Sequence, residues 1–236
     1  MPNMPIKAVF FDLFETLVTE FADGRRISKR NYDYAELLGI PNEDFKQSWN
    51  ERSRQRMTGA FPDYACVLRD ILASRALVCD EERIESLYQA RLIEKALPFH
   101  AIHSDVIALL KTLKSNNIKI GLISNCTEEE VRGLPGSELA AYLDDVIYSF
   151  EVGAAKPDAD IYVRACQRLF VKPEESVFVG DGGSSELDGA REAGMRAYHA
   201  VWFNTYLTSS CKRIASPMEL CSEVLAGRET AAEHNM

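Results

Sequence analysis

An α/β fold built on a parallel sheet is predicted by the order of hydrophobic patterns along this chain of 236 residues. From about residue 98 onwards, short β-branched runs alternate with longer segments whose apolar residues recur at helical spacing. Alternating strands and helices form a parallel sheet that helices cover on both faces. Residues 19–97 show helical spacing and no convincing strand. We therefore expect a Rossmann-like three-layer core, residues 1–18 and 98–236, and a helical cap domain, residues 19–97.

The individual elements follow from these patterns in chain order. The first strand is the buried run KAVFF at residues 7–11, and the later strands are predicted at 118–124, 145–150, 176–180 and 196–203. Helices are predicted at 104–116, 158–170, 186–193 and 216–226, the last of them ending near Gly227. An insertion directly after the first strand lies over the carboxyl ends of the strands, where open α/β sheets bind their ligands.

Charge and composition exclude several classes of protein. The net charge is −9, which argues against a nucleic-acid or acidic-membrane binder because both need a basic surface. No apolar run is long enough to cross a bilayer, and no secretory signal peptide is visible, so we expect a cytoplasmic protein. The six cysteines show no zinc-binding spacing and are expected to be free thiols.

Polar residues follow the predicted strands at the points where these strands end. They are Asp12, Ser124, Asn125, Lys156, Asp181 and Glu186. Each of them alone has an ordinary structural explanation, such as a turn, a helix cap or a surface charge. A parallel sheet brings the carboxyl ends of successive strands to one edge, however, so the set is expected to form one site.

Four sequence motifs around these residues resemble those of the haloacid dehalogenase superfamily, whose members are mostly phosphatases. The motifs are FFDLFETLV at 10–18, LISN at 122–125, EVGAAKPDADIY at 151–162 and VFVGDGGSSELDGAREAGM at 177–195. The resemblance covers the whole chain, including a helical cap between the first two motifs. It implies a hydrolase that acts on a small, anionic substrate, and it leaves the oligomeric state open.

The resemblance also implies a role for each residue. Asp12 would attack phosphorus and form an aspartyl-phosphate, which water then hydrolyses. A Mg²⁺ ion would be bound by Asp12, Asp181 and the backbone carbonyl of Phe14, and Glu186 would hold metal-bound water. Phosphate-binding residues would be Thr16, Ser124, Asn125 and Lys156, with Lys156 also neutralising charge during catalysis.

The sequence departs from the phosphatase pattern at Phe14. Phosphatases of this superfamily carry a second Asp there, which acts as the general acid, and a phenylalanine cannot transfer protons. Neighbouring Glu15 is a candidate substitute, although it is one position out of register. Two alternatives stay open: a 2-haloacid dehalogenase, whose halide leaves without protonation, or a catalytically weak regulatory protein. The acidic fourth motif, GDGGSSELDGA, favours Mg²⁺ and a phosphorus electrophile.

Two features of the predicted cap have weaker interpretations. Arg52 and Arg56 are four residues apart and are expected on one face of a helix, where they are usually solvated but could reach a second anionic group of the substrate. The segment GAFPDY, residues 59–64, breaks the helical pattern and could form a loop that points towards the site.

Overall fold

A six-stranded parallel sheet forms the centre of the computed structural model, which describes residues 5–28, 32–78 and 80–233. The strand order is β5-β4-β1-β6-β7-β8, so β1 is a central strand between β4 and β6. The strands are β1 (Ala8–Phe11), β4 (Lys119–Ser124), β5 (Asp145–Tyr148), β6 (Ser176–Gly180), β7 (Arg196–Ala200) and β8 (Lys212–Ile214). The parallel sheet predicted from the sequence is confirmed.

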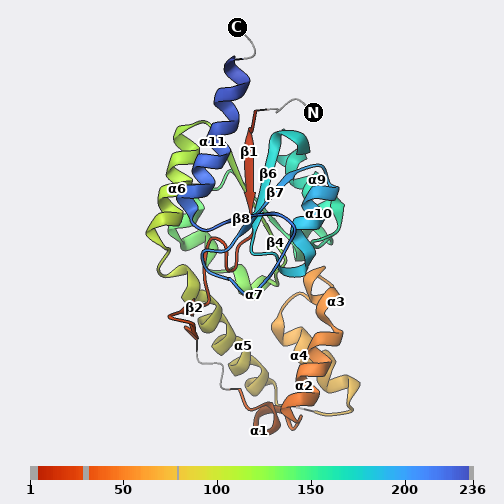
Figure 1. Cartoon of the computed structure of the whole chain (residues 1–236). Coiled ribbons are helices and arrows are strands. Elements are labelled where there is room, and N and C mark those ends of the chain that lie inside the picture. The colour runs from red at the N-terminus through yellow and green to blue at the C-terminus, as the bar shows by residue number, and fades with distance from the viewer. Residues whose placement is uncertain (1–4, 29–31, 79, 234–236) are drawn as a thin grey trace.

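Helices cover both faces of the sheet (Figure 1). On one face lie α6 (Ser104–Ser115) and α11 (Pro217–Glu233), and on the other lie α9 (Ala159–Arg168) and α10 (Glu186–Glu192). Each face has its own apolar core, because the strands are buried on both sides. This arrangement confirms the three-layer fold. The helix α11 continues to Glu233 instead of ending near Gly227.

A set of helices between β1 and α6 lies at the carboxyl ends of the strands (Figure 1). We call α1 to α5, residues 34–96, the helical insertion. Its helices are α1 (Tyr34–Leu38), α2 (Asn42–Glu51), α3 (Ser53–Met57), α4 (Tyr64–Ser74) and α5 (Glu81–Ala96), followed by the 3₁₀ turn η1 (Leu97–Phe99). Asp63 and Asp80 cap α4 and α5 by accepting backbone hydrogen bonds, and the insertion has its own apolar core.

The structure corrects the prediction that residues 19–97 contain no strand. A hairpin of β2 (Phe21–Ala22) and β3 (Arg25–Arg26) precedes the helical insertion, and Asp23 and Gly24 at its turn both have positive φ. Two-residue strands are too short to show any periodicity, and the sixth strand of the main sheet, β8, was missed for the same reason. The strands β5 and β7 end at Tyr148 and Ala200, earlier than predicted.

Several short helices link the longer elements. Two follow strands of the sheet, α7 (Glu128–Val131) after β4 and α8 (Ser149–Val152) after β5. The 3₁₀ turns are η2 (Leu134–Gly136), η3 (Glu138–Ala141), η4 (Pro173–Glu175) and η5 (Gly183–Ser185). These short helices place backbone and side chains of the connecting loops close to the strand ends.

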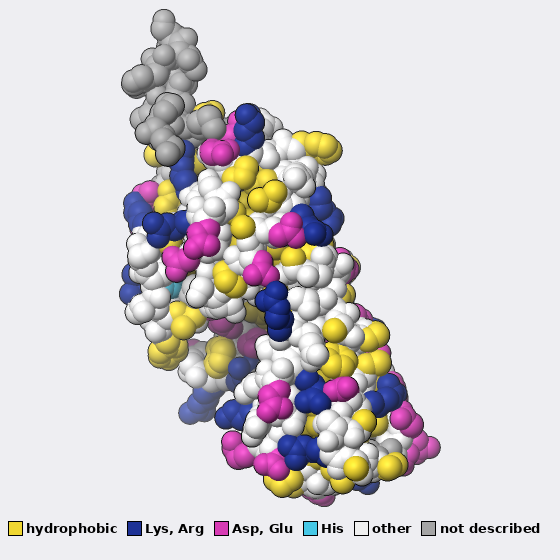
Figure 2. Space-filling model, turned by 90° about the vertical axis from the view of Figure 1, so that its right-hand side faces the viewer, with side chains coloured by type: hydrophobic (Ala, Val, Ile, Leu, Met, Phe, Trp, Pro, Cys, Tyr) yellow, Lys and Arg dark blue, Asp and Glu magenta, His cyan; other side chains and the backbone are white. Residues whose placement is uncertain are grey.

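The face drawn in Figure 2 has no large patch of one charge, because Lys and Arg are interspersed there with Asp and Glu. Among the described residues, no helix is both long and apolar enough to cross a membrane. Cys66, Cys126, Cys166, Cys211 and Cys221 are free thiols, as expected, whereas Cys79 lies outside the described residues.

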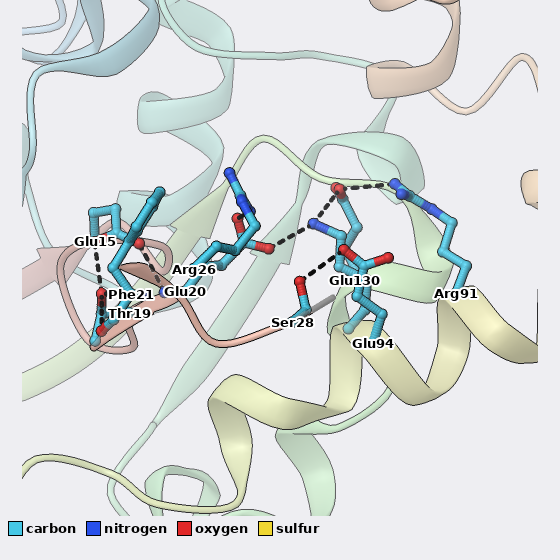
Figure 3. A network of polar contacts seen from close by, with 10 residues as sticks. Glu15, Thr19, Glu20, Phe21, Arg26, Ser28, Arg91, Glu94 and Glu130 are labelled. Atoms are coloured by element: carbon cyan, nitrogen blue, oxygen red, sulfur yellow. Dashed lines mark hydrogen bonds and ion pairs between the residues drawn. The ribbon is translucent and has the colours of Figure 1, made fainter. Parts of the chain in front are cut away.

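A network of ion pairs joins the helical insertion to the core and to the hairpin (Figure 3). On α5, Lys95 pairs with Glu20 at 2.9 Å and with Glu130 at 3.1 Å, and Arg91 pairs with Glu130 at 3.1 Å. Arg91 also donates from Nε to Glu129 at 2.7 Å. Both cations are buried, so water screens these pairs weakly. The network therefore holds α5 against α7 and the hairpin.

Glu130 lies at the centre of this network. Burial alone would raise the pKa of Glu130, but the Lys95 ammonium and the Arg91 guanidinium outweigh burial and lower the pKa to about 2. Thr127 contributes by donating its backbone N–H to Glu130 at 3.2 Å. Since the folded-state pKa lies below the unfolded-state value, Glu130 stabilises the fold above about pH 4.5, and this contribution is lost as pH falls towards 2.

We predict that Glu130→Gln lowers the free energy of unfolding at pH 7 by about 1.5–3 kcal/mol, because the charge that both cations bind is removed. The difference from wild type should shrink as pH falls from about 4.5 towards 2, since wild-type Glu130 becomes protonated over that range. Urea unfolding at a series of pH values measures both effects. As a control, Asp160→Asn removes an exposed pair with Arg164 and should change stability by less than about 1 kcal/mol. Equal effects of the two substitutions would contradict the prediction.

Candidate active site

Three neighbouring strands, β4, β1 and β6, bring the predicted site residues to one edge of the sheet. Phe11 pairs in register with Leu122 on β4 and with Val179 on β6. Asp12 directly follows β1, while Ser124 ends β4 and Asp181 follows β6. The Asp12 backbone N–H extends the ladder by donating to the Val179 carbonyl at 2.8 Å. The carboxylate of Asp12 is therefore held at the centre of the edge.

Lys156 connects two carboxylates of the site. Its ammonium forms ion pairs with Asp12 and Glu186, and the three side chains are almost completely buried. The loop between α8 and α9 that carries Lys156 is held by Asn125. The Asn125 amide donates to the Lys156 carbonyl, and its oxygen accepts from the Lys156 N–H, both at 2.8 Å. In this structure the Asn125 amide positions the Lys156 backbone, and the phosphate-binding role of Asn125 stays a prediction.

Asp12, Asp181 and Glu186 form an acidic cluster. One carboxylate oxygen from each of them lies within 4.8 Å of the others. Glu186 folds back over the end of β6 and accepts from the Gly182 N–H at 3.1 Å. Gly180 leaves room for this arrangement, because a Cβ there would lie 2.0 Å from Glu186 Oε1.

The cluster has strongly perturbed protonation equilibria. Burial raises the pKa of Asp12 even though the Lys156 ammonium lowers it, and the Asp181 carboxylate raises it further. Burial likewise raises the pKa of Glu186 to about 8, with Lys156 opposing and Asp12 adding to the shift. For Lys156 burial acts in the opposite direction, but Asp12 and Glu186 raise its pKa above the usual value. The site is thus short of positive charge.

Two hydroxyls among the predicted site residues are buried and lack hydrogen-bond partners among the described residues. They are Thr16 Oγ1, in the loop after Asp12, and Ser124 Oγ, at the end of β4. Thr16 has no exposed surface and Ser124 is 1% exposed. A buried hydroxyl without a partner is destabilising, and native proteins rarely retain one without a ligand or water. Both hydroxyls were predicted as phosphate-binding groups.

The structure adds supporting residues that sequence reasoning missed. Asn204 donates to Asp181 Oδ2 at 2.8 Å, and buried His199 contacts the Asp181 carbonyl through Nε2 at 2.9 Å. The Trp202 indole donates to the Thr16 carbonyl at 2.9 Å. All three lie in or after β7, whose carboxyl end meets the same edge of the sheet. Their position at the end of a predicted strand was the one sequence signal that could have identified them, because they belong to none of the four motifs.

Phe14 packs against the helical insertion. Its ring makes an edge contact with Phe99 at a centroid distance of 6.4 Å, and the Lys95 ammonium lies 5.4 Å from its centroid. The side chain is half-buried and belongs to the edge of the main apolar core. Neither of these two ring contacts involves the acidic cluster. The backbone carbonyl of Phe14 stays a predicted metal ligand.

Glu15 is bound to the hairpin segment that follows it. Its Oε1 accepts from the Glu20 N–H at 2.8 Å and its Oε2 accepts from the Thr19 hydroxyl at 2.7 Å. Burial raises the pKa of Glu15, and these two hydrogen bonds oppose the rise. Glu15 also lines a cavity of about 410 Å³ with Trp202 and Tyr206. Both carboxylate oxygens stabilise the loop, which argues against Glu15 as the replacement acid.

Arg52 and Arg56 lie one helical turn apart, since the Arg56 N–H donates to the Arg52 carbonyl at 2.9 Å, but their side chains have different partners. Arg52 donates to Asp70 at 2.6 Å within the helical insertion. Arg56 is 5% exposed and stacks on Trp49 with its guanidinium carbon 3.8 Å from the ring centroid. The segment 59–64 contacts the core, since a Cβ at Gly59 would lie 2.1 Å from the Phe150 carbonyl oxygen.

Comparison with known proteins places this geometry in context. The model of the haloacid dehalogenase-like hydrolases matches residues 6–194. The glyceraldehyde 3-phosphate phosphatase of Methanopyrus kandleri is 28% identical over 193 residues, which are 80% of this chain and 82% of that protein.

Solved structures show the same fold. The crystal structure of a HAD phosphatase from Thermococcus onnurineus is 23% identical with a TM-score of 0.63, covering 94% of this chain and 99% of the other. A 2-haloacid dehalogenase from Pseudomonas syringae is also 23% identical, with a TM-score of 0.66 and coverage of 94% and 98%. With the family model matching most of the chain and the four motifs meeting at one sheet edge, this protein belongs to the haloacid dehalogenase-like hydrolases.

Proposed function

We propose that this hydrolase is a Mg²⁺-dependent phosphatase that acts on a small phosphorylated metabolite through an aspartyl-phosphate on Asp12. The observation that carries the proposal is the combination at one sheet edge of Asp12, the Lys156 ammonium and the acidic cluster. The similarity to a glyceraldehyde 3-phosphate phosphatase supports a phosphorylated substrate.

The acidic cluster fits a magnesium ion. Mg²⁺ prefers carboxylate oxygens, and three of them lie within 4.8 Å of one another. Three carboxylates lie beside one ammonium, and burial raises the pKa of Asp12 and of Glu186, so a cation that neutralises their charge would stabilise the cluster. Asp12, Asp181 and Glu186 would hold the ion, which supplies charge neutralisation for the incoming phosphoryl group.

The chain's own residues account for the remaining chemistry. The Asp12 carboxylate attacks phosphorus and displaces the leaving oxygen, and water then attacks the aspartyl-phosphate to release phosphate. Lys156 is buried beside the nucleophile and stabilises negative charge on the transferring group. The Thr16 and Ser124 hydroxyls, which lack partners among the described residues, are available to donate to phosphoryl oxygens.

Phe14 favours a second candidate function. A halide leaves without protonation, so a 2-haloacid dehalogenase needs no acid at this position, and several solved neighbours are dehalogenases. The sequence identity to the dehalogenase from Pseudomonas syringae is only 23%, so the similarity supports a shared fold and not a shared activity. The acidic cluster argues for the phosphatase, because hydrolysis of a carbon–halogen bond by Asp12 needs no cation. A regulatory protein with weak turnover is the third reading.

We further propose that residues 19–97 form a cap over the site. The helical insertion lies at the carboxyl ends of the strands and is tied to the core by the ion pairs of Lys95 and Arg91 (Figures 1 and 3). A closed cap excludes water from the phosphoryl transfer and selects the substrate. The cytoplasmic location and the absence of nucleic-acid and membrane partners stay predictions.

We predict that activity on a panel of phosphorylated metabolites and aryl phosphates requires Mg²⁺ and is lost in EDTA. Asp181→Asn should lower kcat/KM by about a thousandfold or more, because the cation site is weakened. Its melting temperature without metal should equal or exceed that of wild type, since one of three mutually repelling carboxylates is removed. Asp188→Asn, an exposed substitution on α10, is the control. Halide release from 2-haloacids in EDTA, or full activity of Asp181→Asn, would refute the phosphatase proposal.

We further predict that wild-type activity rises steeply as the pKa of the leaving group falls, because Phe14 cannot protonate a departing alkoxide. Phe14→Asp should raise activity on alkyl phosphates by about 100-fold, the low end of the range for general acids, since nearby Lys95 lowers the pKa of the new carboxylate. Phe14→Asn removes the same ring without adding an acid and is the matched control.

Rates on a series of aryl and alkyl phosphates decide this prediction. An equal gain in Phe14→Asn would show that loosened packing against Phe99, and not acid catalysis, raises the rate. If wild type already hydrolyses alkyl phosphates as fast as aryl phosphates, and Glu15→Gln removes that activity, then Glu15 is the acid.

A further inference from the structure

A cavity of about 410 Å³ lies between the hairpin segment and the loop that joins β7 to β8. The described residues that line it belong to the segment 15–24 and to the loop residues 202–206. We call this space the hairpin cavity. A cavity of this volume accommodates a small organic molecule. Neither the attack by Asp12 nor the acidic cluster, as proposed above, makes use of it.

Aromatic side chains form much of the wall of the hairpin cavity. They are Phe21, Trp202, Phe203 and Tyr206. Tyr206 is 89% exposed and Phe21 is 39% exposed, so the wall presents aromatic surface that a ligand from solvent can cover. Exposed aromatic surface gathered around one cavity is typical of a ligand-binding site.

The charge of the wall is negative. Glu15 and Asp23 line the hairpin cavity, and none of the described residues that line it is Lys, Arg or His. The guanidinium of Arg26 stacks over Phe21 at 4.8 Å from the ring centroid, but Arg26 forms an ion pair with Glu20. Its charge is therefore balanced by a carboxylate that is not part of the wall. Two carboxylates and several aromatic faces together attract a cation.

Several polar side chains of the wall have hydrogen-bond partners within the chain. Both carboxylate oxygens of Glu15 accept hydrogen bonds, and the amide oxygen of Asn204 accepts from the Tyr206 N–H at 3.0 Å. These groups offer a ligand their charge and surface more than new hydrogen bonds. An alkylated ammonium suits such a wall, because carboxylates and aromatic faces attract its charge without hydrogen bonds.

The hairpin cavity borders the candidate active site. Asn204 in its wall donates to Asp181 at 2.8 Å, and Trp202 donates to the Thr16 carbonyl at 2.9 Å. A ligand in the hairpin cavity would therefore contact side chains that hold residues of the active site in place.

We propose that the hairpin cavity binds a small alkylated ammonium compound. The ammonium group lies against the aromatic rings and near the carboxylates of Glu15 and Asp23, and its alkyl groups cover apolar surface. The ligand is a separate effector or the ammonium end of a phosphorylated substrate, and both sources share this chemistry. The binding site itself does not depend on the phosphatase function.

Calorimetry with the Mg²⁺-loaded enzyme tests the proposal with two probes of nearly equal shape. Choline carries a trimethylammonium group, whereas 3,3-dimethylbutan-1-ol has carbon in place of the nitrogen and is neutral. Choline should bind about tenfold or more tightly than the neutral alcohol, because the carboxylates and the aromatic faces act on its charge. Equal binding of the two probes, or no binding of choline, would overturn the proposal.

Substitutions at two exposed residues of the wall locate the bound choline. Tyr206→Ala removes one ring and should weaken choline binding by about threefold to thirtyfold. Phe170→Ala is the matched control, because Phe170 is also 89% exposed but is not among the residues that line the cavity, and it should leave the affinity unchanged.

Asp23→Asn removes one charge of the wall and should lower the preference for choline over the neutral alcohol by about threefold or more. The melting temperature should stay unchanged, because asparagine tolerates the positive φ of Asp23. If Tyr206→Ala and Asp23→Asn both bind choline as wild type does, choline binds elsewhere and the proposal is wrong.

A third probe distinguishes the two sources of the ligand. The compound 2-(trimethylammonio)ethylphosphonate joins the same ammonium group to a phosphonate and cannot be hydrolysed by a phosphatase. Binding much tighter than that of choline, and weakened by Tyr206→Ala, would identify the ammonium as the end of a substrate. Binding no tighter than that of choline would identify an effector, and either result supports the cation site. If choline fails these tests while Mg²⁺-dependent phosphatase activity is found, only the proposal for the hairpin cavity is refuted.

Discussion

The contact of Lys156 with Asp12 and Glu186 is the interaction on which the rest of the site depends. It joins the end of β1 and the start of α10 to the loop before α9, three segments that are far apart in the chain. Burial strengthens the attraction between the ammonium and the carboxylates, because the dielectric constant around them is low. Burial also excludes the water that would otherwise solvate the carboxylates. One ammonium cannot balance the three carboxylates of the acidic cluster, and this imbalance supports the proposed binding of a cation together with an anionic substrate.

Around this centre, side-chain amides hold the Lys156 backbone and the Asp181 carboxylate in place, whereas two hydroxyls have no partner among the described residues. Asn125 holds the Lys156 backbone from both sides, and Asn204 holds Asp181. Ser124 and Thr16, in contrast, have buried hydroxyls without partners among the described residues. Groups with partners within the chain hold the site in place, whereas the two hydroxyls are the groups that the proposed function assigns to the phosphate. The difference is visible only once the hydrogen bonds are known.

The same distinction applies where the helical insertion meets the core. Arg91 and Lys95 are both buried cations, and each is bound by carboxylates that hold α5 in place. Arg56 is equally buried in the same region and has only the aromatic face of Trp49. Three cations in similar surroundings thus divide into two that stabilise the closed arrangement and one whose charge is uncompensated.

The sequence by itself determined the fold class and the main members of the site. Parallel strands with alternating helices have a strong hydrophobic pattern, and the strand-end rule places Asp12, Ser124 and Asp181 together without any coordinates. The two-residue strands of the hairpin and the short strand β8 were missed because they are too short to show a period. Only the tertiary structure decided the roles of single side chains. It turned Asn125 towards the Lys156 backbone and bound Glu15 to the segment that leads into the hairpin. It also gave Arg52 and Arg56 different partners, Asp70 and Trp49. Several donors and acceptors compete for each side chain, and tertiary packing decides which of them lies close enough to bind it. Local sequence patterns carry no information about that competition.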